Sequence, residues 1–256
     1  MVCSDFYDFK GKTVLITGAS SGLGERFATI LSSAGAKVIL AARRKDKLQE
    51  VAGKIKNAAI IQLDVANPGS VKEAFEKINK ENEQVDICIN AAGVAKLGYV
   101  FAEKEEDIFN EAYDVNVKGL WLVTKAVANH MKDNKIQGSI INIGSVSGDA
   151  VPAIGGAAYC SAKASVHQLT KTLVGELSPY KIRINTLSTW MIPTPMTESF
   201  LADGKDKIEK MTPLGLAKIS DLDAAILFLA SNEASRYVTG SCLTVDGGVS
   251  WGGSLD

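Results

Sequence analysis

The sequence predicts a doubly wound α/β fold, in which helices cover both faces of a mostly parallel, seven-stranded sheet. Short runs rich in Val, Ile and Leu alternate along the chain with longer stretches of helical period. Such runs are typical of strands buried on both faces of a parallel sheet, and the alternation favours right-handed crossovers. No Pro/Ser-rich linker interrupts the 256 residues, so we expect a single domain, 1–256.

The expected elements follow from these runs. Strands are predicted at 13–17, 37–42, 59–63, 85–90, 139–143, 182–187 and 242–245, and helices at 22–34, 45–56, 69–82, 103–117, 119–132, 157–178 and 220–231. Asn67 before Pro68 and Ser220 before Asp221 are expected helix caps. We interpret segment 188–212, which follows a strand and is less regular, as a substrate lid with one or two short helices.

The composition is that of an ordinary globular protein, with 28 basic and 29 acidic residues. This balance gives no sign of nucleic-acid binding, and no apolar run reaches the ~20 residues of a membrane span. The N-terminus carries early acidic residues and no long apolar stretch, so we expect a cytoplasmic protein. The four cysteines are scattered and expected to be buried thiols, and the two histidines lack ligand spacing, so no metal is predicted.

A glycine-rich turn, TGASSGLG at 17–24, follows the first expected strand. Glycines there would let the backbone turn tightly and approach a pyrophosphate at the N-terminus of the next helix. The spacing differs from the usual G-x-G-x-x-G fingerprint, and glycine-rich turns often have only a structural role. Its place at the first strand-to-helix junction nevertheless favours cofactor binding by Gly18, Ser20, Ser21, Gly22, Leu23 and Gly24.

The end of the second strand indicates which dinucleotide binds. An acidic residue expected there would bind a free ribose 2′-hydroxyl, but the chain has Ala41 and Ala42, followed by Arg43 and Arg44. Guanidinium groups bind phosphate, although two arginines in a loop could also be merely solvated. The sequence therefore favours NADP(H) over NAD(H), with Arg43 predicted to grip the 2′-phosphate.

Tyr159 and Lys163 stand four residues apart in the small-residue stretch AAYCSAKA. On a helix they would share one face, with Cβ atoms about 5–6 Å apart. The lysine could simply extend into water. Alternatively, a cation about 4 Å from the phenol contributes roughly 4 kcal/mol at an effective dielectric of 20. That would lower the phenol pKa by about 3 units, which is the change that activity near neutral pH requires.

These features, with NAAG at 90–93, Asn116, Ser145 and the segment 238–248, resemble the short-chain dehydrogenases/reductases, most closely their 3-oxoacyl-[acyl-carrier-protein] reductase type. The resemblance covers essentially the whole chain and implies a Rossmann fold. It implies that Tyr159 is the general acid, that Lys163 also binds the nicotinamide ribose, and that Ser145 holds the substrate oxygen. Asn116 would anchor a water molecule in a proton relay to the lysine.

The resemblance implies further cofactor contacts and an assembly. The additional cofactor-binding positions are Asp64, Val65, Asn90, Ala91, Gly93, Ile192 and Thr194, beside Tyr159 and Lys163 themselves. The family also suggests a homotetramer or homodimer, with helices 103–132 and 157–178 at its interfaces.

The chain departs from the family after the sixth strand, where Thr189-Trp190 replaces the usual Pro-Gly. An indole cannot adopt positive φ cheaply, so the turn must differ or Trp190 must enter the pocket. We expect Trp190 to form one wall of an apolar substrate site with Met191, Met196 and Phe200. The segment from Ser145 to Tyr159 is also one residue longer than is usual in the family, which could move the substrate wall or be an inert bulge.

The leading interpretation is an NADPH-dependent oxidoreductase that reduces a ketone to a secondary alcohol, with a 3-oxoacyl thioester as a candidate substrate. A sugar, polyol or other secondary-alcohol dehydrogenase is the alternative enzyme, although it would need several polar side chains in the lid. A protein that binds NADP without turnover is a third possibility, because folds are reused in this way.

Overall fold

The computed structural model describes residues 6–101, 105–150, 153 and 155–252. Its centre is a seven-stranded sheet of order β3-β2-β1-β4-β5-β6-β7, and every neighbouring pair is parallel. The strands are β1 (Thr13–Thr17), β2 (Lys37–Ala42), β3 (Ala58–Gln62), β4 (Ile87–Asn90), β5 (Ser139–Ile143), β6 (Arg183–Thr189) and β7 (Cys242–Val245). The predicted doubly wound fold is confirmed, with a sheet that is wholly rather than mostly parallel.

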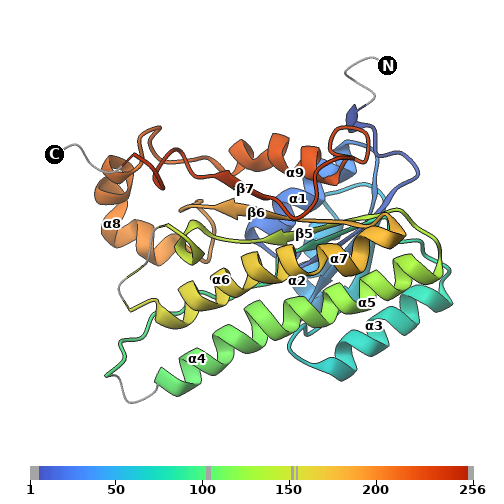
Figure 1. Ribbon diagram of the computed structural model, residues 1–256, viewed down its shortest axis with the longest axis horizontal. Helices are drawn as coiled ribbons and strands as arrows, with labels where there is room; N and C mark the ends of the chain where they lie inside the picture. The colour runs from blue at the N-terminus through green and yellow to red at the C-terminus, as the bar shows by residue number, and fades with distance from the viewer. Residues whose placement is uncertain (1–5, 102–104, 151–152, 154, 253–256) are drawn as a thin grey trace.

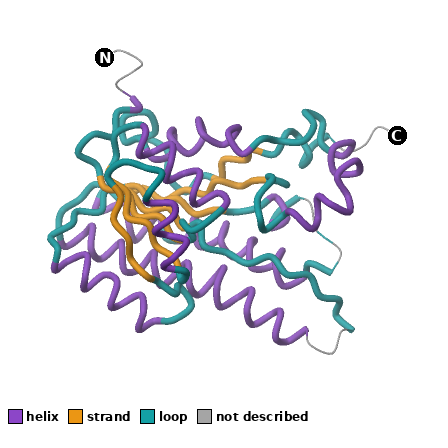
Figure 2. The backbone as a smooth tube through the Cα atoms, turned by 180° about the vertical axis from the view of Figure 1, so that it is seen from behind, coloured by secondary structure: helices purple, strands orange, loops and turns teal. Residues whose placement is uncertain are grey.

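Helices cover both faces of this sheet (Figures 1 and 2). They are α1 (Gly22–Ser33), α2 (Lys45–Ala52), α3 (Pro68–Lys80), α4 (Glu105–Tyr113), α5 (Leu120–Asp133), α6 (Ala157–Thr172), α7 (Val174–Leu177), α8 (Glu198–Met211) and α9 (Asp223–Ala230). One apolar core joins α1, α2 and α9 to one face of the sheet, and a second joins α3 and α5 to the other. The central strands are apolar throughout because both of their faces are covered.

Several helix boundaries differ from the prediction. Asn67 caps α3 as expected, and its side chain accepts a hydrogen bond from the Ser70 amide at 3.1 Å. Ser220 is not a cap, because it lies inside a 3₁₀ turn, Ile219–Leu222, that precedes α9. The predicted helix 157–178 ends its regular part at Thr172 and continues as α7. Residues 103 and 104 of another predicted helix lie outside the described residues.

A π-helical segment, Asp114–Gly119, joins α4 to α5 where the sequence predicts two ordinary helices. A π-helical turn has one more residue than an α-helical turn and is found most often at functional sites. Asn116 lies in this segment and is almost completely buried.

A row of polar side chains crosses the centre of the sheet. Asn90, Asn142 and Thr186 occupy equivalent register positions on β4, β5 and β6. Asn90 Nδ2 donates to Asn142 Oδ1 at 2.9 Å, and Asn142 Nδ2 donates to Thr170 Oγ1, also at 2.9 Å. Thr170 Oγ1 in turn lies 2.8 Å from Thr186 Oγ1. Buried polar groups need such partners, and here the side chains of the row and of α6 supply several of them.

In the described part of the chain, no helix has both the length and the apolar character needed to cross a membrane. Cys88 is a buried free thiol, whereas Cys160 and Cys242 are free and half-buried, which corrects the expectation that all are buried. Cys3 lies outside the described residues.

Candidate active site

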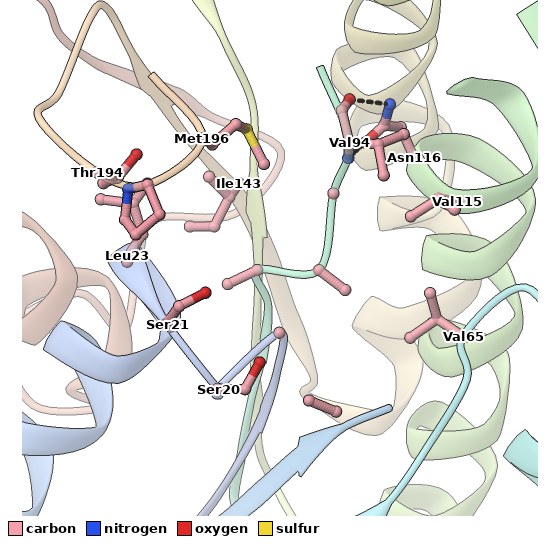
Figure 3. Close-up of a pocket in the computed structure, with 18 of the residues that line it drawn as sticks. Ser20, Ser21, Leu23, Val65, Val94, Val115, Asn116, Ile143, Thr194 and Met196 are labelled. Atoms are coloured by element: carbon pink, nitrogen blue, oxygen red, sulfur yellow. Dashed lines mark hydrogen bonds between the residues drawn. The ribbon is translucent and has the colours of Figure 1, made fainter. Parts of the chain in front are cut away.

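One pocket opens where the strands end, at the edge of the sheet that faces the glycine turn and the segment after β6. Figure 3 shows Ser20, Ser21, Leu23 and Thr194 along one side of it and Val65, Val115 and Asn116 along the other. The predicted site residues that line it are Gly18, Ser20, Ser21, Gly22, Leu23, Gly24, Arg43, Arg44, Asp64, Val65, Ala91, Gly93, Asn116, Ser145, Tyr159, Lys163, Trp190, Ile192, Thr194 and Met196. Residues far apart in sequence thus meet in the crevice that an open α/β sheet offers to ligands.

Among the predicted cofactor-binding residues, Asn90 does not line this pocket. Its side chain lies below the pocket floor in the polar row, where it also donates to Thr124 Oγ1 at 3.0 Å. The Asn90 amide is thus hydrogen-bonded inside the core, and the contact of this residue with the cofactor stays a prediction.

The glycine turn has the close packing that a phosphate cradle needs. Gly18 has φ +67° and Gly22 has φ +59°, which is the left-handed region that favours glycine. A Cβ at Gly18 would lie 2.7 Å from the Ala92 amide nitrogen, and one at Gly24 would lie 2.4 Å from Gly18 O. The turn thus brings bare backbone to the N-terminus of α1, where the helix dipole favours an anion. The residues present fit a dinucleotide.

The two arginines after β2 have different surroundings. Arg44 Nη2 donates to Ser20 Oγ at 3.1 Å and to Ser21 Oγ at 3.3 Å, so the guanidinium lies against the glycine turn. Arg43 also lines the pocket, and its main-chain oxygen accepts a hydrogen bond from Gln62. Arg44, rather than the predicted Arg43, is therefore the arginine whose guanidinium is hydrogen-bonded to the cradle.

Tyr159 and Lys163 share one face of α6, as the spacing predicts. Lys163 is 6% exposed, and its ammonium donates to Ile143 O at 2.8 Å. The same ammonium lies 5.8 Å from the centre of the Tyr159 ring. Lys163 therefore does not extend into water, and burial lowers its pKa to about 8.

The pKa of Tyr159 differs from the expected direction. Burial raises the pKa above its usual value, interaction with the Ser145 side chain acts in the opposite direction, and Cys160 adds a smaller increase. Lys163 is not among the causes of this shift, and its ammonium donates to a main-chain carbonyl. The protein groups alone therefore keep the phenol protonated at neutral pH.

Asn116 fixes the chain that leaves β4. Its Oδ1 accepts from the Val94 amide at 3.0 Å, and its Nδ2 donates to Val94 O at 2.9 Å (Figure 3). A Cβ at Gly93 would lie 2.9 Å from Asn116 Oδ1 and 3.8 Å from Lys163 Nζ. The absence of a side chain at Gly93 thus allows the amide and the lysine to approach the same part of the pocket.

Ser145 begins the 3₁₀ turn Val146–Gly148 directly after β5, and its hydroxyl accepts from the Ser147 amide at 3.2 Å. The longer segment that follows includes residues 151, 152 and 154, which lie outside the described residues. Ser145 nevertheless lines the pocket with Tyr159, as predicted.

The turn after β6 differs from the Pro-Gly turn of the resembling family. Trp190 does not have positive φ, and it lines the pocket with Thr189 and Met196. Met191 and Phe200, which were predicted to share this wall, do not line the pocket. Both are half-buried elsewhere in the segment.

The sequence interpretation missed some lining residues. These are Ala42, Leu63, Ala92, Val94, Val115, Ile143, Gly144, Thr189, Pro195 and Thr197. Most of them adjoin a predicted residue at the end of a strand, so the rule that ligands bind at carboxyl strand ends could have included them. Among the residues that the structure describes, no group of three or more His, Cys, Asp or Glu side chains could hold a metal ion.

The fold and pocket are those of the doubly wound nucleotide-binding proteins, and comparison with known proteins narrows this class. A family model described as Enoyl-(Acyl carrier protein) reductase matches residues 18–250. The oxidoreductase UcpA of Salmonella typhimurium is 36% identical over 250 residues, which cover 93% of this chain and 94% of that protein. The 3-oxoacyl-[acyl-carrier-protein] reductase FabG of Escherichia coli is 35% identical over 244 residues, with 94% and 98% covered.

Solved structures agree. A short-chain type dehydrogenase/reductase from Mycobacterium marinum has a TM-score of 0.91 at 37% identity, with 97% of this chain and 99% of that chain covered. The chain therefore belongs to the short-chain dehydrogenase/reductase family and is an oxidoreductase.

Two similar structures were solved with nicotinamide cofactors. A gluconate 5-dehydrogenase from Burkholderia cenocepacia, in complex with NADP and tartrate, has a TM-score of 0.90 at 30% identity, with 97% and 98% covered. A 3-ketoacyl-(acyl-carrier-protein) reductase from Brucella melitensis, in complex with NADH, has a TM-score of 0.86 at 35% identity, with 94% and 99% covered. Relatives of this chain thus bind either nicotinamide dinucleotide.

Proposed function

We propose that the protein is an NADPH-dependent reductase that converts a ketone to a secondary alcohol. The observation that carries this proposal is the meeting of Ser145, Tyr159 and Lys163 at one end of a pocket whose other end is a glycine cradle. A protein that only bound the dinucleotide would not need this second end. When bound, the reduced nicotinamide supplies the hydride, and the protein supplies orientation and the proton.

The cofactor would extend along the pocket from the arginines to Lys163. Gly18, Ser20, Ser21, Gly22, Leu23 and Gly24 would hold the pyrophosphate, and Asp64, Val65 and Ala91 would line the adenosine side. Gly93 would line the cofactor groove nearer to Lys163. Thr194 packs against the glycine turn, since a Cβ at Gly22 would lie 3.4 Å from Thr194 Cβ, and Ile192 lines the same pocket. By the family resemblance, Ile192 and Thr194 would contact the nicotinamide carboxamide.

The proton would come from the Tyr159 phenol. As the carbonyl carbon gains a hydride, its oxygen gains negative charge and takes the phenolic proton, which leaves a secondary alcohol and a phenolate. Burial keeps Tyr159 protonated before this step, and the Ser145 hydroxyl can hold the same carbonyl oxygen. The Lys163 ammonium, held by Ile143 O, provides the nearby positive charge that stabilises the phenolate.

The preference for NADPH is supported by Arg44. Its guanidinium already bridges Ser20 and Ser21 beside the end of β2, where the 2′-phosphate of NADP would lie. Ala42 lines this end of the pocket in place of an acidic residue that would repel phosphate. Arg43 lies in the same wall and can add charge.

The substrate end favours an uncharged ketone. Apart from Lys163, the charged side chains that line the described pocket are Arg43, Arg44 and Asp64, all from the segments after β2 and β3. Trp190 and Met196 instead give the substrate end an apolar wall. This arrangement suits a 3-oxoacyl thioester or another neutral ketone better than a sugar acid, whose carboxylate would need a cation.

The test is NADPH oxidation over a panel of 3-oxoacyl thioesters, diketones, keto sugars and aromatic ketones, with wild type and Tyr159→Phe. The wild type should turn over at least one neutral ketone. The variant should lose roughly 10²–10⁴-fold in kcat while the Kd of NADPH changes little, because the ring is kept and one proton donor is removed. Tight NADPH binding with no turnover on any carbonyl would instead indicate a sensor.

We also propose a homo-oligomer, and a cytoplasmic location stays a prediction from the sequence. Phe109 on α4 and Trp121 on α5 expose 44% and 39% of their surface along the helices expected at an interface. Light scattering in solution would test this, because a monomer at micromolar concentration would contradict it.

A further inference from the structure

The lid helix α8 has an unusual relation to the rest of the molecule, because none of its residues is buried. Helices of this length are marginally stable alone, and in proteins their stability comes mostly from packing an apolar face. The helix is also irregular at Gly204, where φ −137° and ψ 15° separate an N-terminal from a C-terminal half. The position of α8 therefore depends largely on how its two ends are attached.

The N-terminal end of α8 is attached within its own segment. Thr197 Oγ1 donates to Ile192 O at 2.6 Å and accepts from the Thr194 amide at 2.9 Å. Thr197 also lines the pocket with Met196, so this end forms part of the site itself.

The C-terminal end of α8 is joined to the pocket wall by a side-chain hydrogen bond, and to the tail by the bond from the Leu214 amide to Gly247 O at 3.0 Å. The indole nitrogen of Trp190 donates to Thr212 Oγ1 at 3.2 Å, and that hydroxyl donates in turn to Ile208 O of the last turn of α8 at 2.8 Å. Thr212 is 5% exposed, so little water competes for its hydroxyl. Trp190 itself lines the pocket. One residue thus touches the ligand space with its ring and the end of the lid with its N–H group.

We propose that Trp190 is a positioning and specificity-determining residue that ties the C-terminal half of the lid to the substrate wall through Thr212. A substrate that contacts the indole therefore contacts a residue whose position is coupled to that of the lid. Glycine at this position, which the related family commonly has, could not make such a contact. Only the kinetic measurements with a ketone substrate rest on the proposed function.

Trypsin cleavage at lysines of α8 can measure how firmly the lid is attached. Lys205, Lys207 and Lys210 lie in the C-terminal half of α8 and are exposed, so trypsin can report how often this half opens. In Thr212→Val the shape is kept but the indole loses its acceptor. Cleavage after these lysines should become roughly five- to tenfold faster, as expected for loss of one hydrogen bond. Thr212→Ser should restore the wild-type rate.

Trp190→Phe and the double variant separate a specific contact from general loosening. Trp190→Phe should also speed cleavage, and the double variant should be no faster than Thr212→Val, because both substitutions remove the bond between Trp190 and Thr212. With the best ketone, Thr212→Val should raise KM by roughly five- to tenfold with kcat changed less than twofold, whereas the Kd of NADPH should stay within twofold.

Thr172→Val is the matched control, since it removes an exposed hydroxyl that donates to Gln168 O at the end of α6, away from the lid. It should leave cleavage and KM unchanged. Unchanged cleavage in both Thr212→Val and Trp190→Phe, or additive effects in the double variant, would overturn the proposal. If the wild type turns over no ketone, the proposed function is wrong. The trypsin cleavage rates and the Kd of NADPH would still test this inference.

Discussion

The two ends of the pocket are built in different ways. At the glycine turn, α1 buries Gly24, Phe27, Ala28 and Leu31 against the sheet, so the cradle is part of the core. At the lid, α8 buries no residue, and a few side-chain hydrogen bonds hold it. The cofactor end is therefore fixed by packing of the whole domain, whereas the substrate end is adjustable without disturbing that packing.

The largest expected effect tests this contrast directly, with the same substitution at both ends. Phe27→Ala should lower the free energy of unfolding by about 3–5 kcal/mol, because Phe27 is 0% exposed and leaves a cavity. Phe200→Ala, in half-buried surroundings on α8, should cost less than about 1 kcal/mol. Urea unfolding of both variants provides the measurement, and equal losses would show that the lid is as integral as the cradle.

A smaller effect on stability is expected for Lys163, which is buried in the pocket beside Tyr159. Burial gives Lys163 a folded-state pKa of about 8, below its ordinary value of 10.5. The unfolded chain therefore binds more protons between pH 8 and 10.5, and wild-type stability should rise with pH across this window. Below pH 8 the buried charge costs stability, so Lys163→Met should be roughly 1–3 kcal/mol more stable at pH 7 although inactive.

The measurement is urea unfolding of the cofactor-free protein at pH 7 and at pH 9.5, where the advantage of Lys163→Met should shrink. Lys171→Met, at an exposed position on the same helix, is the matched control and should change stability little. A variant that is less stable than wild type at pH 7 would mean that the bond to Ile143 O outweighs the cost of burying the charge.

The smallest expected effect sharpens the description of the cofactor end. Arg44→Ala should lower the ratio of kcat/KM for NADPH over NADH by about tenfold, or roughly 1.4 kcal/mol, because its guanidinium lies at the cradle. Arg43→Ala should change this ratio less. Steady-state kinetics with both cofactors would measure it. A larger effect at Arg43 would restore the assignment made from the sequence, and no effect at either would remove the basis for NADP preference.

Prediction from the sequence succeeded where structure follows from local pattern. The strands at 13–17, 37–42, 139–143 and 242–245 have the expected bounds, because continuous apolar runs between turns have few alternatives in a buried sheet. The glycine turn and the Tyr159–Lys163 face were predictable for the same reason, since each depends on short-range geometry.

The sequence did not predict the hydrogen-bond partners of side chains when these partners come from distant segments of the chain. Asn90 is the last residue of β4 and could face either the pocket or the core, and its bond to Asn142 of β5 holds it in the core. The direction of the Lys163 ammonium depends on Ile143 O, which is 20 residues away. The π-helical segment around Asn116 was also not predicted, because the sequence pattern there is that of an ordinary helix.

The polar row of Asn90, Asn142 and Thr186 has a consequence for how the chain finds its fold. The central strands are short aliphatic runs, and apolar packing alone would distinguish poorly between neighbouring alignments. A slip of one residue would turn an amide to the opposite face, where it would meet apolar side chains, at a cost of about 1–3 kcal/mol for each unsatisfied group. The row therefore favours the native strand register over neighbouring alignments, in which these amides would lack their partners.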